Sequence, residues 1–548
     1  MQRLKLKKII TMNWKSTLKL VLIQIVLVGM CQYAWAQIPN KIEPFVTPFG
    51  EFDFQRPHFP DKSVNITDFG AKEGGKFKNT EAINKAIKQL SESGGGTVVV
   101  LQGKWLTGPI VLLSNINLHL DEGAELLFSQ DFNDYLPEVL TNFEGSEVYA
   151  YSPFIYSIKQ KNIAVTGKGV LNGQGKPWWE QRKNPGFGNR KLIEMNENEV
   201  PLKERHFNSL KNYLPPVFFG PLYCQHVLLE GVTFKYGAFW TVNPSFCEDV
   251  IVRGIHIITE GKYGHTPNGD GINPNSCQNV LIEYNTISTG DDCITIKSGR
   301  NKDGRRIGMP CKNILIRHNK GLRGHGGIVI GSEMSGGVEN VYAYNCRFNG
   351  TDRVIRIKTD RGRGAYIRNC WFKDISADTI QREAIRINML YSGGNRLPEQ
   401  EVNSGTPVVE NIHYENISCE YAKRNIIQII GLPEMPVNHV SFKNIEMGGK
   451  HGIEVKDAKN ITFENLTISN EVGSPASISF SDSIIINKLK ITETNSEKLP
   501  VQLNDVSHAQ LTNFEYNTEK EMIKIAGKSD HLEFDKSIPE KKIFRETK

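Results

Sequence analysis

One short pattern of polar and hydrophobic positions recurs through most of the chain. A polar residue, often Asn, precedes three to five positions that alternate between hydrophobic and polar, and Gly or Asn turns follow. Copies begin at Asn162-Ile163, His226-Val227, Asp249-Val250, Asn279-Val280, Asn313-Ile314, Asn340-Val341, Ala365-Tyr366, Asn411-Ile412, His439-Val440, Asn460-Ile461 and Ser483-Ile484. Alternation with period two over so few residues predicts short β-strands.

The spacing of the copies indicates how these strands are arranged. From Val227 onward the intervals are 23, 30, 34, 27, 25, 46, 28, 21 and 23 residues, and we interpret the interval of 46 as two coils of 23. No helical periodicity separates the strands, which excludes βαβ units, and propeller blades need about 40 residues. The sequence therefore predicts an all-β parallel β-helix, with coils about 4.8 Å apart around one continuous hydrophobic core.

The remaining segments predict how this solenoid begins and where it is interrupted. Residues 79–90 predict a short N-terminal capping helix, because Asn79 or Thr80 can cap it and its apolar residues share one face. That face contains Ala82, Ile83, Ala86, Ile87 and Leu90. We expect residues 37–60 to be an extended lead-in, 61–548 to be one β-helix catalytic domain, and the charged segment 177–216 to be a long loop insertion. No second domain is expected.

The first 36 residues predict export. Lys15 and Lys19 precede a short apolar run, and Ala34-Trp35-Ala36 follows it, as in a secretory signal peptide cut before Gln37. The run of roughly 11 residues is too short for a membrane-spanning helix of ~20 residues, and Cys31 lacks the small preceding residue of a lipoprotein signal. We expect a monomer that is exported to the periplasm or the extracellular space and is not membrane-bound after cleavage.

Composition and charge narrow the function classes. Of 548 residues, 39% are hydrophobic and 23% charged, which excludes a collagen, a coiled coil and a largely disordered chain. The predicted signal peptide has six basic residues and no acid, and the rest balances 60 basic against 60 acidic residues. The net charge of +6 is therefore no argument for binding nucleic acid.

The cysteines follow the repeat. Eight remain after Cys31, and an even number in an exported protein leaves disulfides open. However, there is no Cys-x-x-Cys pair and no zinc-like spacing. We expect mostly free thiols, buried in a stack.

Four polar segments fall at corresponding places on successive predicted coils. They are Asn268-Gly269-Asp270-Gly271, Gly290-Asp291-Asp292-Cys293, Gly324-His325-Gly326 and Arg356-Ile357-Lys358. Asp291 and His325 both lie 11 residues after the first hydrophobic position of their copy, and Asp270 aligns with Asp292. Three carboxylates and one imidazole should therefore converge on one patch of the wall.

This convergence suggests acid–base chemistry. Carboxylates this close raise at least one pKa, so one can stay protonated while its neighbour is ionised, as hydrolysis of a glycosidic bond requires. Taken singly, each Asp could be a turn residue, His325 a turn histidine, and Arg356 and Lys358 a solvated face. A calcium site is disfavoured by the adjacent histidine and cations, so we expect no metal and no cofactor.

The four motifs, in this order, resemble those of the polygalacturonases of glycoside hydrolase family 28, over roughly residues 64–490. The resemblance implies a right-handed β-helix and metal-free cleavage, with anomeric inversion, of α-1,4-linked galacturonic acid residues in pectin. It implies that Asp291 is the general acid, that Asp270 and Asp292 activate the water, and that His325 supports the protonation state of the acid.

The same resemblance implies the substrate contacts. Arg356 and Lys358 would bind the galacturonate carboxylate, and without it both would be unpaired cations in a desolvated cleft. Asn268 and Tyr391 would also contact the substrate. The middle residue of Asn268-Gly269-Asp270 departs mildly from the family, in which Thr is commonest at that position.

Two insertions favour exo-action. Residues 298–311 lengthen one coil and would place Arg300, Arg305 and Arg306 beside a polyanionic substrate, although a solvated loop is an equal alternative. The insertion 177–216 could close another side of the cleft. Two other functions stay open: a non-catalytic β-helix that binds carbohydrate or acts as an adhesin, and a pectate lyase, which would need a calcium-binding acid cluster. The exact pectic target also stays open.

Overall fold

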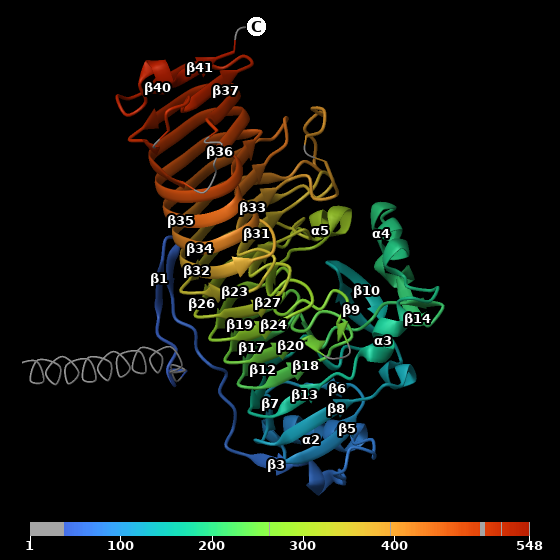
Figure 1. Ribbon diagram of the computed structural model, residues 1–548. Coiled ribbons are helices and arrows are strands. Elements are labelled where there is room, and N and C mark those ends of the chain that lie inside the picture. The colour runs from blue at the N-terminus through green and yellow to red at the C-terminus, as the bar shows by residue number, and fades with distance from the viewer. Residues whose placement is uncertain (1–37, 262–263, 395, 494–498, 517, 547–548) are drawn as a thin grey trace, which may run out of the picture. The chain divides into compact units, whose positions relative to one another are not determined.

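The computed structural model describes residues 38–546, apart from 262–263, 395, 494–498 and 517. The predicted signal peptide, 1–36, lies outside these residues. From Pro44 onward the chain forms one compact unit, while the described residues of the other unit, 38–43, form neither helix nor strand. Within the larger unit the coils succeed one another from β3 (Ser63–Asn65) to β41 (Ile543–Arg545) (Figure 1).

Each coil contributes to three rows of parallel strands. The first row contains β3, β4 (Gly96–Val100), β7 (Ile116–Leu120), β12 (Lys161–Gly167), β17 (Gln225–Glu230), β19 (Glu248–Arg253), β23 (Gln278–Glu283), β26 (Cys311–Arg317) and β29 (Val338–Tyr344). The second contains β5 (Gly103–Thr107), β8 (Ala124–Phe128), β13 (Val170–Asn172), β18 (Thr233–Lys235), β20 (His256–Ile258), β24 (Thr286–Ser288), β27 (Lys320–Arg323), β30 (Arg347–Phe348) and β38 (Glu515–Tyr516).

The third row carries the candidate site. It contains β6 (Ile110–Val111), β11 (Ile155–Ile158), β16 (Phe219–Leu222), β25 (Ile294–Ile296), β28 (Ile328–Ile330), β31 (Ile355–Lys358), β33 (Ile385–Asn388), β39 (Ile523–Ala526) and β41. Bridges at Val242 and Ile272 continue this row between β16 and β25. Beyond β31 the rows merge into long strands that bend around the coil. The first two rows join in β32 (Tyr366–Ile380), and all three join in β34 (Val408–Ile430), β35 (Val437–Lys456) and β36 (Ala458–Glu493). The third row joins the first in β37 (Val501–Thr512), and β40 (Asp530–Phe534) continues the first row. These are the stacked coils of a right-handed parallel β-helix, as predicted.

The recurring Asn of the sequence pattern forms a ladder along the first row. Asn279, Asn313, Asn340, Asn369 and Asn411 all have left-handed backbone angles, with φ between 55° and 59°, a region that Asn tolerates better than most residues. Each side-chain amide donates to the side-chain oxygen of the preceding coil, at 2.7–3.3 Å. The polar position before each strand is therefore a structural requirement of the coil.

The hydrophobic positions of the pattern form one core. Strands such as β4 and β7 alternate strictly between buried and partly exposed residues, and the buried cluster runs from Ile66 to Ile538. The eight described cysteines are all buried and free, which confirms that prediction. Among the described residues, no helix is long and apolar enough to cross a membrane.

The first end of the core is covered by helix α2 (Thr80–Glu92), which buries the five apolar residues predicted for it. Its start differs from the prediction, because neither side chain offered as a cap bonds to the first turn. Asn79 accepts a hydrogen bond from the Lys72 amide at 2.7 Å, and the Thr80 hydroxyl accepts one from the Gly108 amide.

The lead-in from Pro44 to Pro60 contains a small hairpin, β1 (Phe45–Thr47) and β2 (Gly50–Phe52). It packs on the outside of the first row. The Arg317 guanidinium stacks on the Phe45 ring at 3.8 Å, and Arg56 pairs with Glu230 at 2.8 Å.

The copy assigned to Ala365-Tyr366 was wrong. Val341 pairs with Cys370, and Cys370 pairs with Ile412, so Asn369-Cys370 occupies that place in the coil. The interval of 46 residues does not contain two coils, because β32 pairs directly with β34. The extra length is the insertion 391–407 after β33.

The segment 177–216 is more ordered than the predicted loop. It contains most of α3 (Lys176–Gln181), and then α4 (Asn189–Glu197), β14 (His206–Ser209) and β15 (Asn212–Tyr213). With the hairpin β9 (Val139–Phe143) and β10 (Ser146–Ala150) and with α5 (Asn301–Ile307), it forms what we call the side lobe (Figure 1). A second hydrophobic cluster packs the lobe against the coils, with Phe143, Leu192 and Phe207 from the lobe and Trp240 from the coil after β18.

Within the side lobe, a buried ion pair holds segment 177–216 to α5. Arg205 pairs with Asp303 at 2.9 Å, and their side chains are only 4% and 1% exposed. Removing one partner of a buried pair leaves an uncompensated charge. The Asp303→Ala variant should therefore be destabilised by about 3–5 kcal/mol, measured by denaturant unfolding, and residues 177–216 should become more sensitive to proteolysis.

The matched control is Lys302→Ala. Lys302 pairs with Glu199 at 3.4 Å, and the two side chains are 41% and 70% exposed. Exposed pairs contribute about 0–1 kcal/mol, so this variant should behave as wild type. Equal stability of Asp303→Ala and Lys302→Ala would show that the Arg205–Asp303 pair does not hold the lobe.

Candidate active site

The coil register places the predicted residues side by side on the third row. Ile272 pairs with Ile294 and the Gly271 amide donates to the Asp292 carbonyl at 2.9 Å, so Asp270 lies beside Asp292. In the next step along the row, the His325 amide donates to the Asp291 carbonyl at 3.0 Å. Both alignments predicted from the sequence are confirmed.

Asp291 and His325 form a pair at the edge of the site. Asp291 Oδ1 lies 3.0 Å from His325 Nδ1, and the two side chains are 19% and 52% exposed. The hydrogen bond with Asp291 raises the pKa of His325. Burial acts to raise the pKa of Asp291, but the hydrogen bond from His325 and the charge of Lys358 outweigh it, and this pKa is lowered.

Asp270 lies deeper and behaves in the opposite way. Its side chain is buried, and burial, together with the charge of Asp291, raises its pKa well above the ordinary value. Lys297, at 3.7 Å, opposes this shift. One carboxyl with a raised pKa was expected, and it is Asp270 rather than the predicted acid, Asp291.

Asp292 connects the carboxylates to the cations. Its Oδ2 accepts a hydrogen bond from Lys358 Nζ at 2.7 Å, whereas its Oδ1 is buried and has no partner among the described residues. The expectation that Lys358 would be an unpaired cation was therefore wrong, because two coils of β-helix bring a carboxylate within its reach.

Arg356 is the cation left for a ligand. No carboxylate among the described residues pairs with it, and its Nε is buried without a hydrogen-bond partner. The exposed ring of Tyr391 lies over both cations, 5.3 Å from the Arg356 guanidinium and 5.4 Å from Lys358 Nζ. These three residues, predicted from separate segments, are thus brought together.

Asn268 is held by the side lobe. Its Oδ1 accepts a hydrogen bond from Arg182, which follows α3, at 2.9 Å, and a second Arg182 nitrogen donates to the Pro267 carbonyl at 3.1 Å. The side lobe therefore borders the site at the turn that carries Asn268.

Three residues at the site were not predicted. Lys297 is buried, pairs with Glu333 at 2.9 Å and lies 4.4 Å from the centre of the Trp240 ring. The charges of Glu333 and Asp270 outweigh the effect of burial, so the pKa of Lys297 is raised. A lysine ending the hydrophobic run of β25, as Lys358 ends β31, was the signal in the sequence that could have identified it.

The arginines of the insertion 298–311 are paired within the protein. Arg300 pairs with Glu144 of the β9–β10 turn, and Arg306 pairs with Asp303 at 2.9 Å. Arg305 donates to the carbonyl groups of Gly362 and Arg363. They fasten the insertion to its surroundings, and so the expectation of free cations beside a substrate was wrong.

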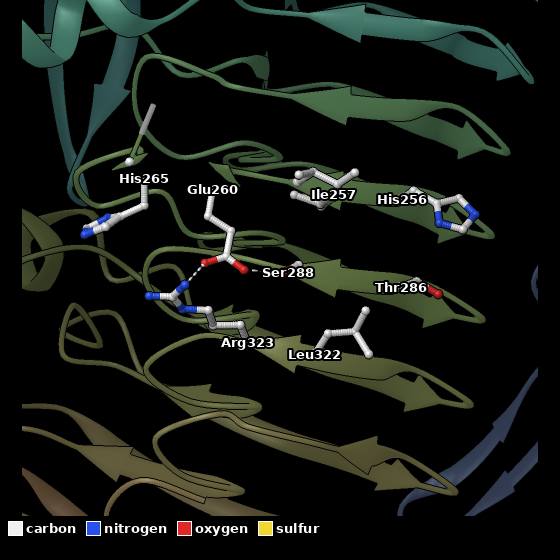
Figure 2. A pocket seen from close by; sticks show the side chains of 10 residues that line it. His256, Ile257, Glu260, His265, Thr286, Ser288, Leu322 and Arg323 are labelled. Carbon is white, nitrogen blue, oxygen red and sulfur yellow. Dashed lines mark hydrogen bonds and ion pairs between the residues drawn. The ribbon is translucent and has the colours of Figure 1, made fainter. Parts of the chain in front are cut away.

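A groove of about 630 Å³ lies on the neighbouring second row (Figure 2). Its charged residues satisfy each other, since Glu260 pairs with Arg323 and accepts a hydrogen bond from Ser288 at 2.6 Å. Its described lining residues include none of the predicted site residues. We therefore place the candidate active site at the clustered carboxylates rather than in this groove.

Comparisons with known proteins identify the family to which this fold belongs. Residues 203–452 match the model of glycosyl hydrolases family 28. The crystal structure of a hyperthermoactive exopolygalacturonase from Thermotoga maritima superposes with a TM-score of 0.69 at 37% identity, over 80% of this chain and 94% of that one. This chain belongs to glycosyl hydrolases family 28.

Other relatives of the family support the same grouping. A probable polygalacturonase from Vitis vinifera is 29% identical over 70% of this chain and 74% of its own. An exo-poly-alpha-D-galacturonosidase from Dickeya chrysanthemi is 25% identical over 75% of this chain and 71% of its own. The chain is thus a glycosidase of the polygalacturonase type, which favours hydrolysis over the non-catalytic and lyase alternatives.

The pair at the edge of the site gives a prediction about protonation. In the Asp291→Asn variant the pKa of His325 should fall, because the amide carries no charge to stabilise the imidazolium. In wild type the imidazolium, and with it the charged hydrogen bond, should persist below the raised pKa and be lost as the pH rises through it. Histidine NMR titration, assigned with His325→Gln, measures both values.

As a control, Asp482→Asn removes the negative charge beside a distant histidine, His508, whose Nδ1 lies 2.9 Å from Asp482 Oδ1. It should leave the pKa of His325 unchanged. An unaltered His325 titration in Asp291→Asn would contradict the coupling.

Proposed function

We propose that this protein is an exported, monomeric hydrolase that cleaves α-1,4-linked galacturonic acid residues of pectin from a chain end, with inversion of the anomeric carbon. The observation that carries the proposal is the convergence of Asp270, Asp291 and Asp292 on two adjacent coils, beside His325 and an unpaired Arg356. The names of the relatives, which include polygalacturonases and exopolygalacturonases, support it.

Asp291 is proposed to protonate the leaving oxygen. In the free protein its lowered pKa leaves the proton on His325, whose Nδ1 lies 3.0 Å from Asp291 Oδ1. A bound galacturonate brings negative charge and excludes water, and both changes raise the pKa of a carboxyl. The proton can then pass from His325 through Asp291 to the glycosidic oxygen, and His325 serves as its reservoir.

Asp292 and Asp270 are proposed to hold and deprotonate the attacking water. The unpartnered Oδ1 of Asp292 offers an acceptor at which a water can be oriented. Asp270 lies beside it, and because burial raises its pKa despite Lys297 at 3.7 Å, it is proposed to orient the water while Asp292, paired with Lys358 at 2.7 Å, takes the proton. An acid and a base on opposite sides of the scissile bond, with a water between, give inversion.

Arg356 is proposed to bind the carboxylate of the sugar, with Lys358 and Tyr391 completing the subsite. A guanidinium can hold a carboxylate through two parallel hydrogen bonds. Lys358 already pairs with Asp292 at 2.7 Å. It would therefore contact the substrate carboxylate and Asp292 at the same time.

The side lobe is the proposed reason for exo-action. Arg182 joins it to the turn of Asn268, and Trp240 belongs to the hydrophobic cluster that packs it against the coils, while also packing against Lys297. It therefore forms a wall immediately beside the catalytic carboxylates, where an endo-acting enzyme would need an open path for the chain.

Activity should depend on the transferable proton of Asp291. Wild type incubated with polygalacturonate and a chelator should release reducing ends without ultraviolet-absorbing unsaturated products. The Asp291→Asn variant keeps the side-chain size but cannot donate the proton, so kcat should fall by about 10²–10⁴-fold. Near-normal turnover in a folded Asp291→Asn variant would remove Asp291 from the mechanism, and unsaturated products would indicate elimination.

Cleavage should release single sugars from the start of the digestion, because the side lobe is proposed to block the path of the chain on one side of the carboxylates. Chromatography of products at low conversion, with viscosity followed in parallel, measures this. Early mixed oligomers with a rapid fall in viscosity would show an endo-acting enzyme.

A further inference from the structure

A second arginine continues the outward face of the third row beyond Arg356. Arg386 in β33 pairs in register with Arg356 in β31. Each lies between two buried isoleucines, Ile355 and Ile357 or Ile385 and Ile387. Alternate residues of a strand point to opposite faces, so both guanidinium groups lie on the outer face, one coil apart.

The surroundings of Arg386 carry an excess of positive charge. Glu383 is shared by three arginines: Arg353 at 2.8 Å, and Arg386 and Arg424 at 3.6 Å each. Arg382 nearby pairs with Asp352 at 3.3 Å. With Arg356, five cations therefore face two carboxylates, and like charges this close are unfavourable unless an anion joins them.

The atoms left without partners indicate what that anion carries. Among the described residues, neither the buried Nε of Arg386 nor that of Arg356 has a hydrogen-bond acceptor. On the next coil Gln428 pairs in register with Arg386, and its Oε1 is also buried and unpartnered, while its amide donates to Glu454 at 2.7 Å. The protein therefore does not use the full hydrogen-bonding capacity of these side chains, and both guanidinium groups stay partly exposed, so their outer nitrogens can meet the carboxylate of a sugar acid.

We propose that Arg386 and Gln428 form a second sugar-acid subsite, in which Arg386 binds the carboxylate of a different galacturonate from the one held by Arg356. This inference rests on the proposed function. Successive coils lie about 4.8 Å apart, so the two guanidinium groups are placed to read two sugars of one chain. The preferred substrate is then a pectic chain with free carboxylates on neighbouring sugars, rather than one in which neutral sugars alternate.

A purely structural role for Arg386 is less consistent with the geometry. Glu383 already has a closer partner in the buried Arg353, and burial and the neighbouring arginines lower the pKa of Arg386, which opposes the attraction of Glu383. An arginine needed only to neutralise Glu383 would approach it more closely than 3.6 Å.

The test uses three trigalacturonates, each methyl-esterified on one sugar, beside the unesterified trimer. Losing a charged hydrogen bond should lower wild-type kcat/KM by at least about tenfold for two of the three esters. Arg356→Ala should abolish the penalty for one ester, and Arg386→Ala the penalty for the other, because a charge pair already removed cannot be lost again. The penalty is a ratio within each variant, so partial misfolding does not affect it.

Two further variants serve as controls. Arg386→Lys keeps the charge but cannot form bidentate hydrogen bonds, so it should retain part of the ester penalty in kcat/KM. Arg347→Ala removes an exposed arginine of the second row, paired with Asp378 at 3.0 Å, and should retain all of it. If both alanine variants abolish the same penalty, or if Arg386→Ala abolishes none, the second subsite is excluded while the proposed function stands. Failure of wild type to cleave the unesterified trimer would exclude both.

Discussion

Register between neighbouring coils is the constraint on which the rest of this protein depends. A shift of one residue in a strand exchanges its buried and exposed faces, so the hydrophobic core permits only one alignment of each coil with the next. The asparagine ladder strengthens this alignment, since each side-chain amide bonds to the equivalent position one coil away. Because the core holds the register, polar residues far apart in sequence are placed side by side without any contact of their own.

The active site uses this alignment to bring like charges together. Asp270, Asp291 and Asp292 are tolerated in one buried patch because each has a cation nearby: Lys297, His325 and Lys358, respectively. These cations come from successive coils of the same row and are held by the same strand pairing. The arrangement separates the carboxylates chemically, with Asp270 favouring its protonated form and Asp291 its ionised form, before any substrate is present.

The arginines on the two sides of this cluster differ in how they are paired. Toward the side lobe, arginines such as Arg205 and Arg300 pair with Asp303 and Glu144, respectively, and these pairs hold the segments of the lobe together. Along the third row toward the C-terminus, no carboxylate among the described residues pairs with Arg356, and Arg386 shares Glu383 with two other arginines. The charges are thus paired within the side lobe, whereas positive charge is in excess along the third row. Under the proposed function, this difference would orient a polyanionic substrate chain along the row.

The sequence by itself determined the architecture and which polar residues converge on the candidate site. The periodic pattern specifies which residues face inward, and aligning the copies was enough to place Asp270 beside Asp292 and Asp291 beside His325. The same pattern could not distinguish Ala365-Tyr366 from Asn369-Cys370 as the start of a coil, because both precede alternating residues. Only the tertiary structure determined which partner each charged side chain has. It paired Lys358 with Asp292, engaged the arginines of 298–311, folded 177–216 into a lobe, and brought Lys297 and Arg386 to the site. Such pairings depend on distances between side chains from different coils and insertions, and a one-dimensional period carries no information about them.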